Sequence, residues 1–183
     1  MNWFKSMNLP NKLTIIRVLA IPFFLIFLYI SKGVFRFLPL LIFAAAAITD
    51  AVDGHIARRD NLITDFGKFM DPLADKLLTT AAFIAFVEIG YLSSWVVILI
   101  ISREFLISGF RTLAASKGIT IAANPWGKIK TVFQMILIVV ILLNYTGYAN
   151  FTTSWITPLV AIVVLLTVTS GATYIYENIE VIK

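Results

Sequence analysis

Six apolar segments make up most of the chain, and each is close to the length needed to cross a lipid bilayer. They cover residues 13–30, 37–52, 72–90, 94–113, 125–145 and 155–176. A transmembrane helix needs about 20 consecutive, mostly apolar residues. The intervening residues are rich in glycine, proline and polar side chains, and no gap is long enough to separate two domains. The sequence therefore predicts an all-α integral membrane protein, with one six-helix domain over residues 1–183 and a short interfacial segment at residues 1–12.

The composition agrees with a membrane protein and narrows its partners. Hydrophobic residues are 60% of the chain and charged residues 14%, with a mean hydropathy of +0.91, whereas about a quarter of the residues in soluble domains are charged. The chain has no cysteine, so disulfides and thiolate chemistry are excluded. The net charge of +5 is spread along the chain. We therefore expect anionic lipids or phosphate-bearing substrates as partners, and no nucleic acid.

The distribution of basic residues predicts the direction of the spans. Lysine and arginine accumulate on the cytoplasmic side of membrane proteins. If both termini are inside, only Lys32 and Arg36 of the 15 basic residues fall in outer gaps. We therefore expect a multi-pass protein of the cell membrane whose polar chemistry faces the cytoplasm.

Four aspartates occur at the inner ends of the second and third segments. Asp50 and Asp53 are three residues apart, and Asp71 and Asp75 are four apart. On a helix both spacings place the two residues on one face, and a short connection makes the two helices neighbours. Four converging carboxylates would repel one another unless cations lay between them. Oxygen ligands suit Mg²⁺, Mn²⁺ or Ca²⁺, so the pattern predicts a divalent metal site.

Helix dipoles offer an alternative explanation for part of this pattern. Acidic residues are common in a first helical turn, which would account for Asp71 and Asp75. Asp50 and Asp53 lie at the opposite end of their segment, where the dipole disfavours acids. Acid pairs on both helices therefore favour the metal site.

Small and basic residues follow the first acid pair. Gly54 and Ala57 leave room for a ligand or a helix near the backbone, and Arg58 can engage a phosphate through its planar guanidinium. Gly67 either caps the turn into the third segment or clears space beside it. Together with a metal site, these residues predict a cradle for a pyrophosphate.

The complete pattern resembles a known signature. Asp50-x-x-Asp53-Gly54-x-x-Ala57-Arg58, followed after eight residues by Gly67-x-x-x-Asp71-x-x-x-Asp75, is similar to the signature of the CDP-alcohol phosphotransferase family. The resemblance implies a six-helix fold, usually a homodimer, that binds two divalent cations (Mg²⁺ or Mn²⁺) and a CDP-linked alcohol. These enzymes displace CMP by attack of an acceptor hydroxyl on the β-phosphate.

The resemblance also implies roles for individual residues. Asp50, Asp53 and Asp71 would be metal ligands, and Asp75 would be both a ligand and the catalytic base. The residues implied in nucleotide and CDP-lipid binding are Gly54, Ala57, Arg58 and Gly67.

Polar residues elsewhere indicate the acceptor. Arg103 and Arg111 lie about two turns apart in one segment, and Lys128 and Lys130 begin the next. Arg103 is flanked by apolar residues, so we expect it to face a cavity or an acid, whereas a lysine at a helix end commonly reaches lipid headgroups. Several cations near a metal site predict an acceptor that carries its own phosphate.

Three further runs, RExxISxxR, GKxKTxxQ and NLPNKLTIIR, resemble a narrower group, the bacterial CDP-diacylglycerol–glycerol-3-phosphate 3-phosphatidyltransferases. Its members use CDP-diacylglycerol and sn-glycerol 3-phosphate and contribute to phospholipid biosynthesis. In that reading Arg103, Arg111, Lys128 and Lys130 bind the acceptor phosphate. Asn11, Thr14 and Arg17 would lie near the nucleotide. Alternatively, Asn11 and Thr14 form a turn and a helix cap after a proline.

Other functions remain open from the sequence. Within the enzyme class, the acceptor could be inositol phosphate, serine or phosphatidylglycerol. A divalent-cation transporter would also explain acids in a helix bundle. A transport path, however, requires polar residues near the midplane and beyond, and the outer halves of the last two segments have almost none.

Overall fold

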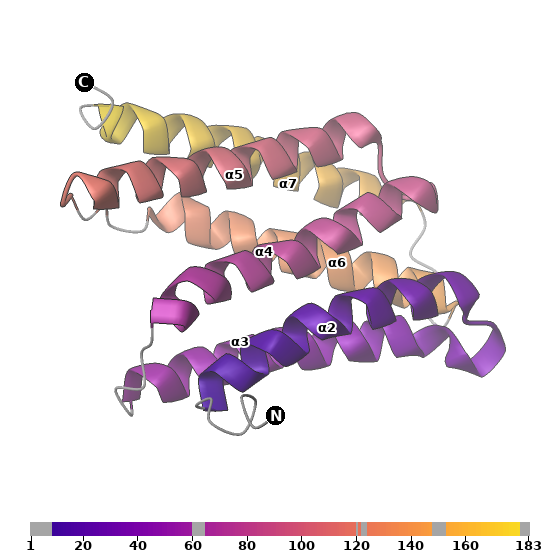
Figure 1. The fold of residues 1–183 in the computed structure, drawn as a ribbon. Coiled ribbons are helices and arrows are strands. Elements are labelled where there is room, and N and C mark those ends of the chain that lie inside the picture. The colour runs from indigo at the N-terminus through magenta and orange to yellow at the C-terminus, as the bar shows by residue number, and fades with distance from the viewer. Residues whose placement is uncertain (1–8, 60–64, 120, 122–123, 148–152, 180–183) are drawn as a thin grey trace. The chain divides into compact units, whose positions relative to one another are not determined.

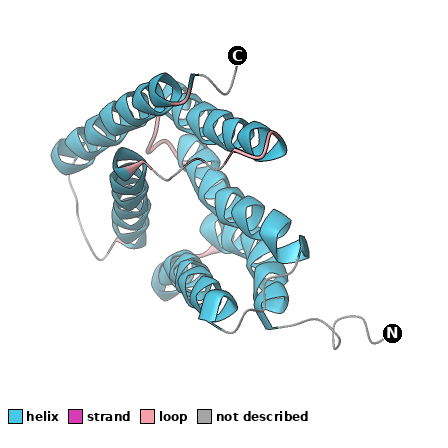
Figure 2. Ribbon diagram, turned by 90° about the vertical axis from the view of Figure 1, so that its left-hand side faces the viewer, coloured by secondary structure: helices cyan, strands magenta, loops and turns pink. Residues whose placement is uncertain are grey.

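The computed structural model describes the backbone of residues 9–59, 65–119, 121, 124–147 and 153–179, and their side chains except at 9–10, 50–59, 65–72, 75 and 153. This part of the chain contains six α-helices, one short 3-10 helix and no strand (Figures 1 and 2). The elements are α2 (Leu9–Ile30), η1 (Gly33–Phe37), α3 (Leu38–Arg59), α4 (Asp65–Glu88), α5 (Ser94–Ser116), α6 (Pro125–Thr146) and α7 (Thr153–Glu177). Every predicted apolar segment forms a helix, which confirms the all-α class.

Two helices extend well beyond their predicted bounds. α3 continues to Arg59, seven residues past the predicted end at residue 52, and α4 begins at Asp65 instead of residue 72. Hydropathy marks the end of an apolar run, but helical hydrogen bonding continues through alanine, arginine and lysine, which are good helix formers. The aspartate pairs therefore lie inside helices.

Helix ends coincide with residues that suit them. Asn124 precedes α6, and its side-chain oxygen accepts a hydrogen bond from the backbone N–H of Trp126 at 2.8 Å. This satisfies one of the N–H groups left free at a helix start, and Pro125 fits the first helical position because it has no N–H to satisfy. At the end of α5, Gly118 adopts a φ of +73°, and the N–H of Ile119 donates to the carbonyl of Ala114 at 2.9 Å. This left-handed residue closes the helix.

The chain forms two compact units. The first comprises residues Met1–Ala85 and Tyr145–Gly147, in which α2 and α3 pack side by side (Figure 1). Phe24 and Phe43 are buried between helices, with ring centroids 6.1 Å apart. Tyr145 donates its hydroxyl hydrogen bond to the carbonyl of Leu28, and the guanidinium of Arg36 lies 5.7 Å from the Tyr145 ring centroid. The single domain over residues 1–183 stays a prediction.

The second unit comprises residues Phe86–Asn144 and Tyr148–Lys183. In it α5 and α7 lie side by side (Figure 1). The buried residues of α5 recur at helical spacing on one face, and they are Val97, Ile100, Ile107, Phe110 and Ala114. The ring of Phe110 meets that of Tyr174 edge to face, with centroids 6.1 Å apart. Tyr174 also accepts a hydrogen bond from Arg111, so this aromatic contact adjoins a polar contact between the same two helices.

Among the described residues, three helices are long and apolar enough to cross a membrane: Asn11–Ile30, Pro125–Thr146 and Ser154–Glu177. A shorter apolar stretch covers Gly33–Thr49. The count of six spans therefore stays a prediction.

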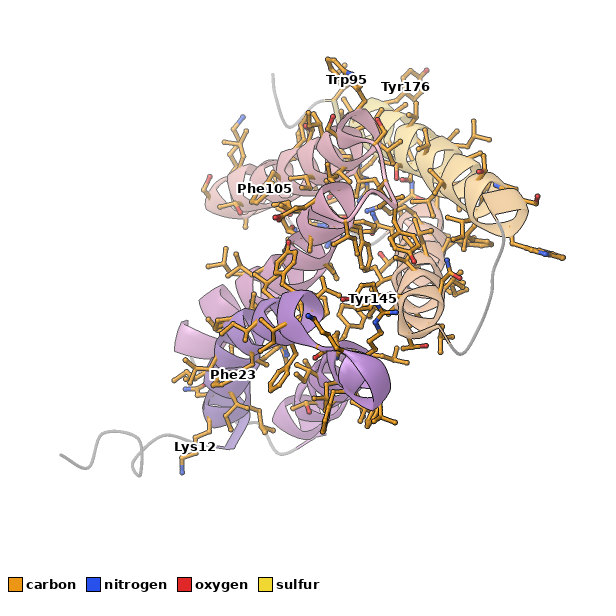
Figure 3. The ribbon with its side chains drawn as sticks, turned by 90° about the vertical axis from the view of Figure 1, so that its right-hand side faces the viewer. Lys12, Phe23, Trp95, Phe105, Tyr145 and Tyr176 are labelled. Carbon is orange, nitrogen blue, oxygen red and sulfur yellow. The ribbon has the colours of Figure 1, made fainter. Side chains whose placement is uncertain are left out.

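Exposed aromatic side chains mark both ends of the second unit. Trp95 and Trp155 lie in the first turns of α5 and α7, while Trp126 and Tyr176 lie at the start of α6 and the end of α7; all four are exposed. Figure 3 shows Trp95 and Tyr176 projecting outward. Tryptophan and tyrosine concentrate at the two membrane–water interfaces. These positions are the ones expected in helices that could cross a membrane.

Two adjacent phenylalanines on α2 allow a test of this packing. Phe24 is 0% exposed and Phe23 is 57% exposed. Phe24→Ala is expected to lower the free energy of unfolding by about 3 to 5 kcal/mol, because it leaves a cavity against Phe43. Phe23→Ala is the matched control and should change it by less than about 0.5 kcal/mol. Denaturant titration in detergent micelles, followed by tryptophan fluorescence, measures both; equal effects would contradict the packing.

Candidate functional site

The helix bounds place the four aspartates inside two helices of the first unit. Asp50 and Asp53 lie in α3, and Asp71 and Asp75 lie in α4 as its seventh and eleventh residues. The dipole acts on the first turn of a helix, so it does not account for Asp71 and Asp75. Their side chains lie outside the described part of the structure, as do those of Gly54, Ala57, Arg58 and Gly67. Among the side chains that the structure describes, no group of three metal-ligating residues occurs.

The bounds of α4 also show whether Gly67 lies before the helix or within it. It is the third residue of α4, so the capping alternative is wrong and the glycine lies within the helix. Gly54, Ala57 and Arg58 occupy the last two turns of α3. All of these residues belong to the first unit.

A buried polar stripe begins α2 in the same unit. Asn11, Thr14 and Arg17 are three residues apart along one face, and all three are buried. Since α2 begins at Leu9, Asn11 and Thr14 lie within the helix, and their interpretation as a turn and a cap is wrong. α2 and α3 are antiparallel neighbours joined by η1, so the stripe and the aspartates of α3 share one end of the pair (Figure 1).

In the second unit a partly buried ion-pair cluster links α5 to α6. The ammonium of Lys130 on α6 pairs with the carboxylate of Glu104 on α5, and Lys130 is 0% exposed. Nη1 of Arg103 lies 3.6 Å from Oε1 of the same carboxylate. Two cations therefore share one anion among the described side chains. A buried charge is costly without such a partner.

The side chain of Arg103 lies against two glycines. A Cβ at Gly171 on α7 would be 3.2 Å from Cγ of Arg103, and one at Gly127 on α6 would be 3.4 Å from its Nη2. The guanidinium thus lies where two helices have no side chain. Its Nε is buried and makes no hydrogen bond in the described part of the chain.

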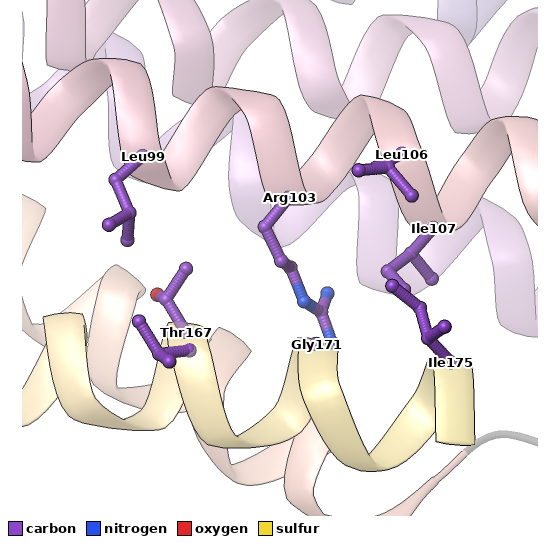
Figure 4. Close-up of a pocket in the computed structure, with 8 residues that line it drawn as sticks. Leu99, Arg103, Leu106, Ile107, Thr167, Gly171 and Ile175 are labelled. Atoms are coloured by element: carbon purple, nitrogen blue, oxygen red, sulfur yellow. The ribbon is translucent and has the colours of Figure 1, made fainter. Parts of the chain in front are cut away.

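Arg103 also lines a cavity of about 200 Å³ between α5 and α7 (Figure 4). The remaining lining is almost wholly apolar, and it consists of Leu99, Leu106, Ile107, Thr167, Val168, Gly171 and Ile175. In Figure 4 the arginine side chain extends from α5 toward Gly171 on α7. Arg103 was predicted to face a cavity or an acid. It faces both, this cavity and the carboxylate of Glu104, which confirms the prediction.

Arg111 lies two turns further along α5 and contacts α7. Its Nε donates a hydrogen bond to the hydroxyl of Tyr174 at 3.1 Å, and its guanidinium carbon lies 5.7 Å from the ring centroid. Tyr174 is buried whereas Arg111 is exposed. The tyrosine therefore fixes the stem of an arginine that still reaches the surface. Lys128, at the start of α6, is exposed.

Comparison with known proteins identifies the family. The model of the CDP-alcohol phosphatidyltransferase family matches residues 7–169. The chain belongs to this family. It is 40% identical over 188 residues to the CDP-diacylglycerol–glycerol-3-phosphate 3-phosphatidyltransferase of Bacillus subtilis, covering 96% of this chain and 97% of that one.

Two further relatives have similar names. The protein of the same name from Rickettsia bellii is 41% identical over 140 residues, covering 76% of this chain and 77% of the relative. A probable phosphatidylglycerophosphate synthase of Mycobacterium tuberculosis is 36% identical over 171 residues, covering 92% and 80%. As a CDP-alcohol phosphatidyltransferase, the chain is a phosphotransferase of a family that uses divalent metal ions.

Sequence reasoning missed two residues that complete this phosphatidyltransferase's polar cluster. Tyr174 and Gly171 lie in an apolar segment to which no role was assigned. A signal was present, because Thr167, Ser170 and Tyr174 are spaced three and four residues apart and are all buried. Such a polar face on an apolar helix indicates contact with polar groups on neighbouring helices.

The ion pair can be tested by a double-mutant cycle. Glu104→Gln leaves the Lys130 ammonium buried without its carboxylate, so it should lower the free energy of unfolding by about 3 to 5 kcal/mol. Combining it with Lys130→Met should restore most of the loss, because both charges are then removed. Glu177→Gln is the control, since this exposed carboxylate only accepts a hydrogen bond from Asn124 at 3.0 Å. Additive losses in micelle unfolding would show that the pair is not coupled.

Proposed function

We propose that the protein transfers a phosphatidyl group from CDP-diacylglycerol to sn-glycerol 3-phosphate, giving phosphatidylglycerophosphate and CMP. The observation that carries this proposal is the 40% identity to the Bacillus subtilis enzyme of that name along 96% of the chain. The primary hydroxyl oxygen of the acceptor forms a bond to the β-phosphorus of CDP-diacylglycerol. The bond from that phosphorus to the bridging oxygen breaks, and CMP leaves with the electron pair. The hydroxyl proton passes to Asp75.

Asp50, Asp53, Asp71 and Asp75 are the proposed ligands of two divalent cations, Mg²⁺ or Mn²⁺. The residues fit such a group, because all four donors are carboxylates and each pair has a spacing that shares a helix face. When bound, the cations neutralise charge on the diphosphate. The proposed CDP-lipid pocket adds Gly54, Ala57, Arg58 and Gly67, with Asn11, Thr14 and Arg17 near the nucleotide. Burial of the α2 stripe supports this assignment, since buried polar and charged residues in a membrane helix commonly mark a substrate or ion site.

Arg103, Arg111, Lys128 and Lys130 are the proposed residues of the acceptor site. The two guanidinium groups of α5, that of Arg103 lining the cavity and that of Arg111 exposed, support an anionic ligand. We assign direct phosphate contact to Arg103 and Arg111, whose guanidinium groups suit the oxygens of a phosphate. Lys130 acts through Glu104 by holding that carboxylate away from the phosphate. Lys128, being exposed, draws anions toward the site.

The proposed setting is the cell membrane, with six spans, both termini and the active site on the cytoplasmic side, and two copies forming a homodimer. The aromatic residues at both ends of the second unit support insertion in lipid. The concentration of lysine and arginine outside the predicted outer gaps supports the direction.

The reaction can be tested with purified enzyme in mixed micelles containing CDP-diacylglycerol. We expect CMP release with sn-glycerol 3-phosphate and Mg²⁺ or Mn²⁺, and none after chelation with EDTA. Asp75→Asn should reduce turnover by at least about a thousandfold while retaining CDP-diacylglycerol binding, because the proton acceptor and one metal ligand are altered. Activity with inositol 3-phosphate, serine or phosphatidylglycerol, but not with glycerol 3-phosphate, would contradict the proposed acceptor.

The close contact between Gly171 and the side chain of Arg103 gives a second test with an internal control. Gly171→Ala forces Cγ of Arg103 to move, because the new Cβ would lie only 3.2 Å away, whereas a Cβ at Gly109 on α5 meets nothing within 4 Å. We expect Gly171→Ala to raise KM for glycerol 3-phosphate about tenfold and Gly109→Ala to leave it unchanged. KM for CDP-diacylglycerol should be the same in both. An unchanged acceptor KM in Gly171→Ala would place the acceptor phosphate elsewhere.

A further inference from the structure

One buried polar group near the ion-pair cluster has no role in the function proposed so far. Gln134 on α6 is only 6% exposed, and its amide nitrogen makes no hydrogen bond in the described part of the chain. A buried amide donor without a partner costs free energy, so such groups are nearly always paired with protein, water or ligand. This amide donor is therefore available to a group outside the described part of the chain, such as a ligand or water.

The position of Gln134 along α6 restricts that partner. It lies one helical turn beyond Lys130, about 6 Å along the axis, on the same face of the helix. The next buried residues on this face are Leu137 and Ile138, both 0% exposed. Gln134 is therefore the last polar group before the apolar core of α6.

The hydrogen-bonding groups of the Gln134 amide restrict the chemical class of its partner further. A phosphate group is matched by the guanidinium groups and ammonium described above, which have only donors. A carboxamide is uncharged, and it can both donate and accept a hydrogen bond. It therefore suits an uncharged hydroxyl, which also donates and accepts.

We propose that Gln134 is a specificity-determining residue whose amide hydrogen-bonds the secondary hydroxyl of the acceptor's glycerol moiety. This inference rests on the proposed function and adds to it the recognition of the polyol portion of the acceptor. The primary hydroxyl is the nucleophile and the phosphate is held by arginine, so the secondary hydroxyl is the remaining polar group of the molecule. A site built to hydrogen-bond a hydroxyl rejects an analogue that lacks it.

The test compares two acceptors in two variants. Propane-1,3-diol monophosphate keeps the primary hydroxyl and the phosphate of glycerol 3-phosphate but lacks the secondary hydroxyl. Gln134→Met keeps the length of the side chain and removes the amide. Asn144→Leu is the matched control, because this second amide of α6 has a partner in the chain, the Tyr91 hydroxyl at 3.4 Å. The measured quantity is the ratio of kcat/KM for the two acceptors at saturating CDP-diacylglycerol.

We expect the wild type and Asn144→Leu to prefer glycerol 3-phosphate by roughly tenfold, as one hydrogen bond predicts. Gln134→Met should reduce that preference to below about twofold, with no change in KM for CDP-diacylglycerol. If this variant does not fold, Gln134→Asn should give the same loss of preference, because its amide is one methylene too short. Two results would overturn the inference and assign the amide to water or to packing. One is an active Gln134 variant that keeps the wild-type preference for glycerol 3-phosphate. The other is an equal loss of kcat/KM with both acceptors. Absence of wild-type activity with glycerol 3-phosphate would instead overturn the proposed function, and this inference with it.

Discussion

The cost of keeping charged side chains inside an apolar helix bundle governs the polar half of this structure. Lys130 is completely buried, and the carboxylate of Glu104 on the neighbouring helix helps to make that position tolerable. The same carboxylate lies near Arg103, which in turn lies against the backbone of α6 and α7. One shared anion thus connects three helices.

In both units, buried helix faces change from polar to apolar along their length. In α2 the buried face begins with Asn11, Thr14 and Arg17, and it continues with Phe24 and Leu28. In α6 it begins with Lys130 and Gln134, and it continues with buried leucines and isoleucines. The apolar part supplies packing, while the polar part faces substrates and ions in the proposed mechanism. Chemistry at a membrane surface requires this division, because water, nucleotide and glycerol phosphate reach only the end of a helix.

The sequence predicted the helices well and their ends less well. Long apolar runs identified all six, and glycine, proline and asparagine marked several boundaries, as Asn124 and Gly118 show. Hydropathy could not locate the start of α4 or the end of α3, because charged residues interrupt an apolar run without breaking helical hydrogen bonds. The signature aspartates were identified from their spacing, their place at the ends of two apolar segments and the family resemblance, and their role as metal ligands stays a prediction. Gly171 and Tyr174 were missed because their importance depends on which residue of another helix lies opposite them, and spacing within one helix does not contain that information.

The close packing of Arg103 against Gly171 has an evolutionary consequence. A new Cβ at Gly171 would lie 3.2 Å from Cγ of Arg103, which is tighter than an ordinary contact, whereas one at Gly127 would make an ordinary contact of 3.4 Å with Nη2. Replacing the arginine with a smaller side chain would leave space beside Gly171 unfilled, and enlarging Gly171 would push the stem of the arginine aside. Single substitutions at Arg103 or Gly171 are therefore disfavoured. Descendants of this protein can acquire different residues there through coordinated changes on α5 and α7, which ties the divergence of these two helices to one side chain.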